Sequence, residues 1–191
     1  MAALAVCAWA SSAGLARAEK ADRTQPMVVE ADKPGSADLK TRVVTFNGNV
    51  LIAQGTMQIR AERVEVSESA DGFRSAVAQG AAGRPASFKQ KRDGVDEWVE
   101  ASAERIEFDS RTDTLRFLGN AVVRRQRGGA TVDEITGGTI TWDNRGELFR
   151  VEGGQATAAN PTGRVRAVLS PRTEGQASAP AAPPSRAQEK K

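Results

Sequence analysis

A strand-and-turn phrase occurs twice in this chain of 191 residues and restricts the folds open to it. It appears as TFNGNVLI from residue 45 and as LRFLGNAVV from residue 115, and both copies contain Phe-x-Gly-Asn. Alternation of apolar and polar residues with a period of two predicts a β-strand. A glycine inside such a run favours a turn or a close approach of two backbones. The repeat therefore predicts long strands that are interrupted at defined points.

Short strand-like segments fill most of the remaining chain between residues 27 and 170. They are separated by Gly, Asp, Asn or Pro at intervals of roughly 8 to 12 residues, a spacing typical of all-β folds. In chain order they read MVVEA, FRSAVA, ASFKQ, EWVEA, RIEF, TITWD, LFRVEG and GRVRAVL. Helical periodicity is weak throughout. The fold class predicted is all-β, with many short antiparallel strands.

The alternation changes phase inside several of these segments. AERVEV at 61–66 recurs as AERIEF at 103–108. Ile59 and Ala61 share one parity whereas Val64 and Val66 take the other, and Ile135 is out of phase with Ile140 in the same way. Such a slip moves side chains to the other face unless the strand bulges or turns a corner there. Repeated corners predict a folded-over sheet, such as a jellyroll or a β-solenoid.

The composition argues against most catalytic chemistry. The chain has no histidine, and its one cysteine, Cys7, lies near the N-terminus, so common nucleophile–base triads and most zinc sites are not expected. The carboxylates of Asp96, Glu97, Asp133 and Glu134 occupy polar stretches that read as solvated turns. We therefore expect no enzyme, no catalytic residue, no metal site and no cofactor. The formal charge of +3 is interleaved along the chain, so no nucleic-acid partner is expected either.

Composition also divides the chain into four parts. Residues 1–18 are apolar and end in Ala-Arg-Ala, which predicts a cleavable signal peptide, although a short buried helix is the alternative. Residues 19–26 form a polar lead-in, and residues 27–170 form the folded domain. Residues 171–191 are rich in proline and predict a disordered tail.

Parity places a set of apolar side chains on one side of the folded-over sheet. This face forms either an ordinary packed core or the floor of a hydrophobic groove, and composition does not choose between the two. Its members are Met27, Val29, Phe46, Val50, Ile52, Ile59, Val64, Val66, Phe88, Ile106, Phe108 and Phe117.

Five segments of the chain together resemble the OstA-like family of periplasmic lipopolysaccharide-transport proteins. They read QPMVVEAD, VVTFNGNVLIAQGTMQIRAERVEV, GRPASF, LRFLGNAVV and GRVRAVLSP. The resemblance runs from about residue 25 to residue 171. Residues 33–41 and 81–87 depart from the family pattern. By resemblance, Met27, Val29, Phe88 and Phe108 are groove residues, and the other eight follow from parity.

The resemblance implies an open β-jellyroll that binds lipopolysaccharide with its acyl chains in an apolar groove. It also implies head-to-tail self-association, an LptC-like inner-membrane partner and an LptD-like outer-membrane translocon. Two alternatives remain at this point. One is an LptC-like relative with a membrane anchor, and the other is a self-assembling β-scaffold without lipid cargo.

Overall fold

A computed structural model describes residues 22, 24–92, 94–146, 148–157 and 160–171, and these residues form twelve β-strands. The strands are β1 (Val28–Glu30), β2 (Lys33–Asp38), β3 (Val43–Gln54), β4 (Met57–Glu68), β5 (Arg74–Gln79), β6 (Ala86–Lys91), β7 (Glu97–Ala103), β8 (Arg105–Asp109), β9 (Thr114–Arg127), β10 (Ala130–Asp143), β11 (Leu148–Glu152) and β12 (Arg166–Leu169). All pair antiparallel within one sheet. The all-β prediction is confirmed.

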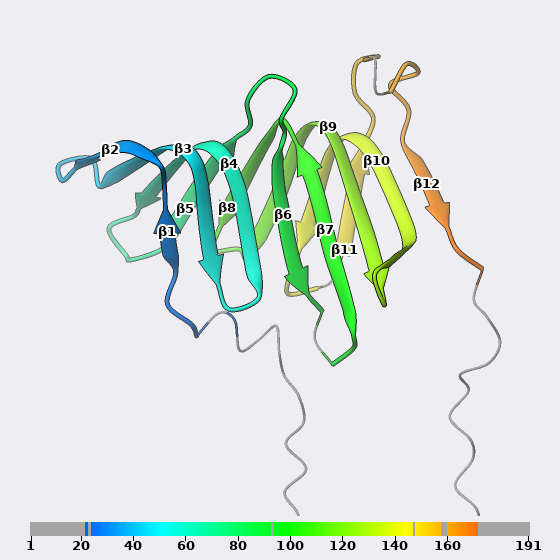
Figure 1. The fold of residues 1–191 in the computed structure, drawn as a ribbon, viewed down its shortest axis with the longest axis horizontal. Helices are drawn as coiled ribbons and strands as arrows, with labels where there is room; N and C mark the ends of the chain where they lie inside the picture. Colours follow the sequence, from blue (N-terminus) through cyan, green and yellow to red (C-terminus); the bar gives the residue numbers. More distant parts are fainter. Residues whose placement is uncertain (1–21, 23, 93, 147, 158–159, 172–191) are drawn as a thin grey trace, which may run out of the picture.

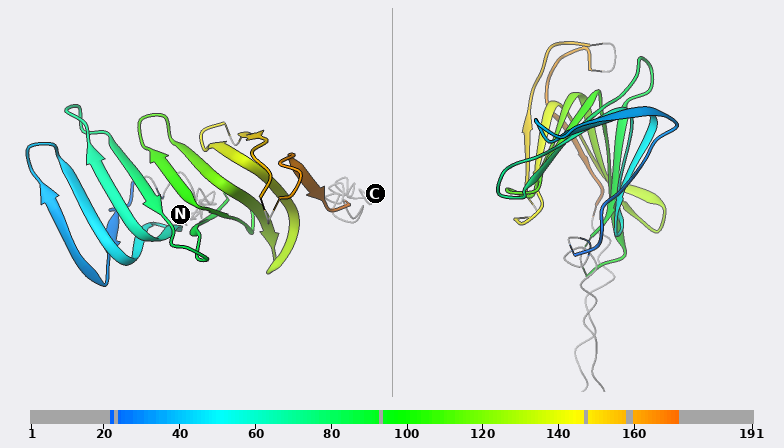
Figure 2. Two further views of the ribbon diagram at one scale, coloured as in Figure 1. Left: turned by 90° about the horizontal axis from the view of Figure 1, so that it is seen from above. Right: turned by 90° about the vertical axis from the view of Figure 1, so that its left-hand side faces the viewer.

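The sheet is folded lengthwise into two arms that meet at a ridge and spread apart toward a mouth (Figures 1 and 2). Strands β3, β4, β9 and β10 are long enough to run through both arms. The first arm also contains β1, β6, β7 and β12, and the second arm also contains β2, β5, β8 and β11. The fold is thus the open β-jellyroll that the family resemblance implies.

The two Phe-x-Gly-Asn phrases form the corners of β3 and β9. Gly48 and Asn49 have φ of 75° and 43°, and Gly119 and Asn120 have φ of 77° and 48°. Two successive residues in this left-handed region reverse the pleat, and glycine enters the region without steric cost. The pairing of β3 with β4 shifts register between Asn47 and Val50. The predicted corner at Ala61–Val64 faces this shift and is confirmed.

The remaining corners complete the ridge. The pairing of β10 with β9 shifts register between Gly137 and Thr139, as the change of phase predicts. Where no strand runs through, one strand ends and another begins: β7 ends at Ala103 and β8 begins at Arg105. The backbone amide of Glu104 donates to Gly119 O at 3.0 Å, which joins this break to the corner of β9. Corners on neighbouring strands therefore align into one continuous fold line.

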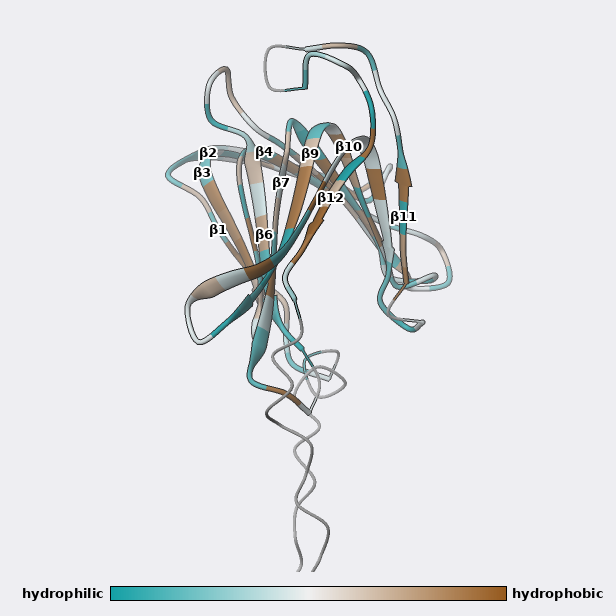
Figure 3. Ribbon diagram, turned by 90° about the vertical axis from the view of Figure 1, so that its right-hand side faces the viewer, coloured by the Kyte–Doolittle hydropathy of each residue, from teal (hydrophilic) through white to brown (hydrophobic). Residues whose placement is uncertain are grey.

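The two arms contribute apolar side chains to one buried cluster, and Figure 3 shows apolar residues along the strands of both arms. Cross-strand pairing aligns them in rows along the sheet, and the row nearest the ridge in the second arm is Phe46, Val64, Ala78, Ile106, Phe117, Ile140 and Val151. Midway along the molecule the arms touch. The ring of Phe88 packs edge-to-face on Phe117 and Trp142, with centroids 5.7 and 5.5 Å apart. These contacts fix the angle between the arms.

Several sequence predictions need revision or lie outside the described residues. Residues 33–38, which departed from the family pattern, form the edge strand β2, bulged between Lys33 and Ser36. The lead-in is anchored at Asp22, which is buried. The predicted signal peptide, Cys7 and all of the predicted tail except residue 171 lie outside the described residues. In the part of the chain that the structure describes, no helix is long and apolar enough to span a membrane.

Candidate functional site

All twelve predicted groove residues face the space between the arms and belong to one hydrophobic cluster. Eight are buried: Val50, Ile52, Ile59, Val64, Phe88, Ile106, Phe108 and Phe117. Four are partly buried at its margin: Met27, Val29, Phe46 and Val66. Parity therefore predicted correctly which side chains point inward. Whether they contact lipid stays a prediction, because in the middle of the molecule the inward residues fill the interior and pack against one another.

Toward the C-terminal end the arms separate and leave a pocket of about 210 Å³. Its apolar lining comes from residues that the predicted groove set omits: Val99, Val123, Ile135, Trp142, Phe149 and Leu169. Trp142 stacks on Phe149 with ring centroids 5.5 Å apart and an interplanar angle of 13°. The same parity rule would have found most of these residues if it had been applied to β7, β10 and β11.

Near the N-terminal end of the mouth, Asp22 and Gln25 are hydrogen-bonded to the first arm. Asp22 accepts a hydrogen bond from the Thr56 backbone amide at 2.8 Å and another from Gln90 Nε2 at 3.2 Å. Residues 24–26 lead to Met27, which lies just before β1. Met27 and Phe108 line opposite sides of a pocket of about 350 Å³ between the arms. The described residues of the lead-in are thus attached to the first arm beside this pocket.

The C-terminal end of the mouth carries charge instead. Glu97 has a side chain that is 5% exposed, and it accepts hydrogen bonds from Arg92 at 2.6 Å, from Arg125 at 3.4 Å and from Arg127 Nε at 2.9 Å. Arg125 also pairs with Asp133. The expectation that Glu97 and Asp133 lie in solvated turns is wrong, because both belong to strands and both pair with arginines.

The arginines control the ionisation of Glu97. Burial opposes the charged form of this carboxylate, but the hydrogen bonds from Arg127 and Arg92 and the charge of Arg125 outweigh it. The pKa of Glu97 therefore lies below its ordinary value of 4.5. The carboxylate stays ionised and holds three guanidinium groups at the entrance of the pocket.

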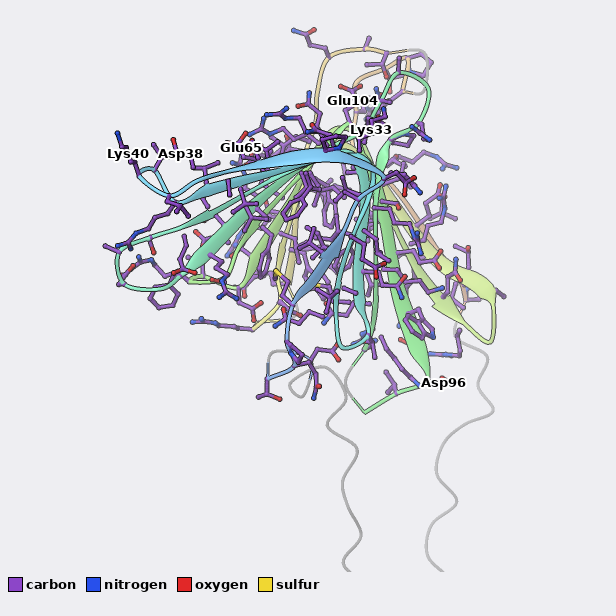
Figure 4. The ribbon with its side chains drawn as sticks, turned by 60° about the vertical axis from the view of Figure 1, so that its left-hand side comes forward. Lys33, Asp38, Lys40, Glu65, Asp96 and Glu104 are labelled. Carbon is purple, nitrogen blue, oxygen red and sulfur yellow. The ribbon has the colours of Figure 1, made fainter. Side chains whose placement is uncertain are left out.

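Other charged side chains lie on the outside of the molecule. Lys33 and Glu104 sit at the ridge, Asp96 at the tip of the first arm, and Asp38 and Lys40 at the turn between β2 and β3 (Figure 4). Among the described residues, no group of three or more Asp, Glu, His or Cys side chains is arranged to hold a metal ion. The described site is an apolar trough with a charged entrance.

Both ends of the folded sheet present edge strands. The N-terminal edge consists of β1 and β2, and the C-terminal edge consists of β11 and β12. All four residues of β12 are exposed, including Val168 at 44% and Leu169 at 69%. Open edges with apolar side chains are normally suppressed because they invite pairing with another chain.

Comparison with known proteins places this architecture in a family. Residues 28–147 match the family described as LptA/(LptD N-terminal domain) LPS transport protein. The chain is 34% identical over 115 residues to the lipopolysaccharide export system protein LptA of Escherichia coli (strain K12), and the match covers 60% of each protein. It is 30% identical over 168 residues to the protein of the same name from Haemophilus influenzae, which covers 88% of this chain and 89% of the relative.

A solved structure agrees with the fold. The crystal structure of LptH, described as the LptA homologous periplasmic component of the lipopolysaccharide transport device of Pseudomonas aeruginosa, superimposes with a TM-score of 0.65 at 24% identity. The match covers 78% of this chain and 99% of the LptH chain. With sequence, corners and arms in agreement, the chain belongs to the LptA/LptD N-terminal domain family of lipopolysaccharide transport proteins.

Proposed function

We propose that this protein is a periplasmic carrier of lipopolysaccharide and a component of a bridge between the inner and outer membranes. The acyl chains occupy the space between the arms, and the sugars remain outside the mouth. The observation that carries this proposal is the apolar lining, which runs along both arms and opens into a pocket at the C-terminal end. The names of the relatives, which are lipopolysaccharide export proteins, agree with it.

The physical chemistry of the cargo explains the need for such a trough. Each buried methylene contributes about 0.8 kcal/mol, so exposing one 12-carbon acyl chain to water costs roughly 9 kcal/mol. A lipid with several chains cannot cross an aqueous space unassisted at a useful rate. A dry channel meets this need without any bond being made or broken, so the proposed activity is transport rather than catalysis.

The bridge itself requires copies to join end to end. In this proposal the C-terminal edge of one copy pairs with the N-terminal edge of the next by strand addition, which continues both arms and the trough between them. An LptC-like inner-membrane protein and an LptD-like outer-membrane translocon terminate the chain of copies. A head-to-tail interface without a closing rotation produces open-ended oligomers.

Photocrosslinking tests the carrier proposal. Phe108 faces the interior and lines the mouth, whereas its neighbour Glu107 lies on the outer face and pairs with Arg116 at 3.0 Å. A photoreactive residue at position 108 should give ultraviolet-dependent adducts with lipopolysaccharide, and the same probe at position 107 should not. Equal adducts at both positions, or none at either, would contradict transport through the interior and favour a scaffold without lipid cargo.

Truncation tests the assembly. Removing residues 162–170 deletes β12, which is joined to the sheet by pairing with four residues of β10. We expect a folded protein that no longer forms concentration-dependent oligomers in sedimentation velocity, while removal of residues 172–191 leaves them intact. A monomer at every concentration of the full chain would overturn strand addition. N-terminal sequencing of the exported protein separates this carrier from an anchored LptC-like relative, because the carrier should begin at Glu19.

A further inference from the structure

Rows of paired residues cross each arm from one free edge of the sheet to the other. In the first arm, one inward-facing row starts at Val29 on β1 and ends at Ala167 on β12. Between these ends it passes through Ile52, Ile59, Phe88, Ala101, Val123 and Ile135. Within the described chain, β1 pairs only with β3 and β12 only with β10. Both ends of the row are therefore open to pairing with another chain.

The adjoining outer-face row on the ridge side has opposite charges at its two ends. It starts at Glu30 and ends at Arg166. Glu30 is exposed and has no ion pair among the described residues. Arg166 is 67% exposed, and its contact with Glu134 is long at 3.7 Å. A second molecule can therefore reach both charges.

The second arm repeats this arrangement with the signs exchanged. Its outer-face row at the ridge starts at Lys33 on β2 and ends at Glu152 on β11. Lys33 is 63% exposed although it pairs with Glu62 at 2.8 Å. Glu152 is exposed and has no ion pair in the part of the chain that the structure describes. Beside the ridge, the N-terminal edge thus presents an acid and a base, and the C-terminal edge presents the complementary base and acid.

Strand direction limits how two copies can join. In the first arm β3 runs toward the mouth and β10 runs away from it, so their antiparallel partners β1 and β12 run in opposite directions. A copy placed in line therefore brings its β1 antiparallel to β12 of the preceding copy and continues the sheet. Two identical edges pair antiparallel only after a half-turn, which sets the ridge of one copy beside the mouth of the other and interrupts the trough.

The register of such a joint is set by the side chains at the edges. A slip of one residue would put inward side chains of one copy in line with outward side chains of the next. A slip of two residues keeps the faces but moves Glu30 from Arg166 to Val168. Only one register continues the apolar row and also brings the opposite charges together.

We propose that copies of this chain join in one register, in which Val29 of one copy lies beside Ala167 of the preceding copy. The facing pairs across the joint are then Val28 with Val168, Glu30 with Arg166 and Lys33 with Glu152. The occupant of the C-terminal edge is a second copy of this chain, selected by complementary charge at the ridge. The inference rests on the proposed bridge function and adds to it the register of the joint and the residues that set it.

Disulfide crosslinking tests the register. In a Cys7→Ala background, Val28→Cys combined with Val168→Cys should give a ladder of covalent oligomers on mild oxidation. Directly opposed residues have Cα atoms about 4.5–5.5 Å apart, which a disulfide can span. The matched control combines Val28→Cys with Ser170→Cys, which lies two residues further on and keeps every charge. Its diagonal separation of about 7–8 Å should give at least about fivefold less ladder. Val28→Cys alone should give no covalent dimer.

Charge exchange tests the ion pair at the ridge. Glu30→Arg should weaken self-association at least about fivefold in sedimentation velocity, because like charges placed opposite each other across strands repel. Adding Arg166→Glu to the same chain should restore it to within about twofold of the wild type. The control is Glu65→Arg, which makes the same change on the outer face of β4, away from both edges, where Glu65 pairs with Arg63 at 3.6 Å. This control should associate like the wild type.

The outcomes separate this inference from the bridge function. If the wild type assembles but the offset cysteine pair crosslinks as well as the aligned pair, the register is wrong. Covalent dimers of Val28→Cys alone would show pairing of two N-terminal edges and overturn it too. An exchanged chain that associates as weakly as Glu30→Arg would remove the role of the ion pair. Melting temperatures identify a charge variant that fails to fold, and the crosslinking, which keeps all charges, then decides. A wild type that stays monomeric at every concentration overturns the bridge together with this inference.

Discussion

The middle and the C-terminal end of the trough are built from the same kinds of inward-facing residues but differ in their contacts. In the middle, Phe88 of the first arm meets Phe117 and Trp142 of the second arm, and the interior is filled. At the C-terminal end, Phe149 packs on one face against Trp142 and borders a pocket. Inward orientation alone therefore does not separate a core residue from a binding residue. A core residue and a binding residue differ in whether the arms touch at that position or leave a pocket beside it.

The two ends of the mouth also differ. Near the N-terminal end, Asp22 accepts hydrogen bonds from the uncharged groups of Thr56 and Gln90. The C-terminal end is bordered by Glu97 and its three arginines. Both ends of the mouth border a pocket between the arms, but the carboxylate near the N-terminal end has uncharged donors, whereas the carboxylate near the C-terminal end has arginine donors. We therefore expect Asp22 to stabilise the fold through its hydrogen bonds to neutral donors, and Glu97 to do so through its arginine partners.

The largest loss of stability is expected from removing a large side chain in the middle of the trough. Phe88→Ala removes a side chain that is 2% exposed and that joins the two arms, and should lower the free energy of unfolding by about 3–5 kcal/mol. Phe149→Ala at the open end should cost clearly less, because its ring is only partly buried. Urea denaturation of both variants measures the difference. Equal losses would mean that the open end is also packed core.

A substitution at the ridge should have an intermediate effect. A Cβ at Gly138 would lie 2.5 Å from Gly154 Cα and 2.8 Å from Gly153 O, which are backbone atoms that cannot move alone. Gly138→Ala should therefore destabilise the C-terminal half by about 1–3 kcal/mol. Gly146→Ala, whose Cβ would meet the carboxylate side chain of Asp143 at 3.3 Å, is the control and should stay within about 0.5 kcal/mol. Thermal unfolding of both variants checks this.

Removing the hydrogen bonds of Asp22 should lower stability somewhat less. Asp22→Ala leaves the Thr56 amide and Gln90 without their acceptor and should lower stability by about 1–2 kcal/mol. If these hydrogen bonds hold the chain before Met27 against the first arm, the variant should also bind more of a dye that reports exposed apolar surface. Unchanged dye binding in a destabilised variant would show that Asp22 stabilises the turn without covering the interior.

The smallest expected effect is on stability at acidic pH. Because the pKa of Glu97 is lower in the folded protein than its ordinary value of 4.5, the ionised carboxylate adds stability above that pH. This contribution is lost as the pH falls from about 4.5 through the folded value. The wild type should therefore lose stability more steeply in that window than Glu97→Gln, as measured by melting temperature against pH. Parallel curves would show that the arginines do not stabilise the charged form.

The sequence predicted the inner walls of the trough better than it predicted the space between them. Alternation placed Ile59, Val64 and Phe108 on the inner face, and the change of phase after Ala61 located a corner. In the structure, the two Gly-Asn pairs lie at the corners of β3 and β9. These features could be predicted because strand pleating and the freedom of glycine act within two or three residues of the chain.

Other features depended on residues far apart in the chain. Glu97 was assigned to a solvated turn because its sequence neighbours are polar, yet its partners Arg125 and Arg127 come from a strand about 30 residues away. Asp22 meets Gln90 across 68 residues. Local pattern contains no information about such pairings, which exist only once the sheet has folded over.

The sequence by itself determined that this chain forms strands, where those strands turn corners and which side chains point inward. Only the tertiary structure decided where the inward side chains meet and where they leave a pocket. The reason is that pleating is a property of neighbouring residues, whereas the separation of the arms depends on how Phe88, Phe117 and Trp142, from three different strands, pack together.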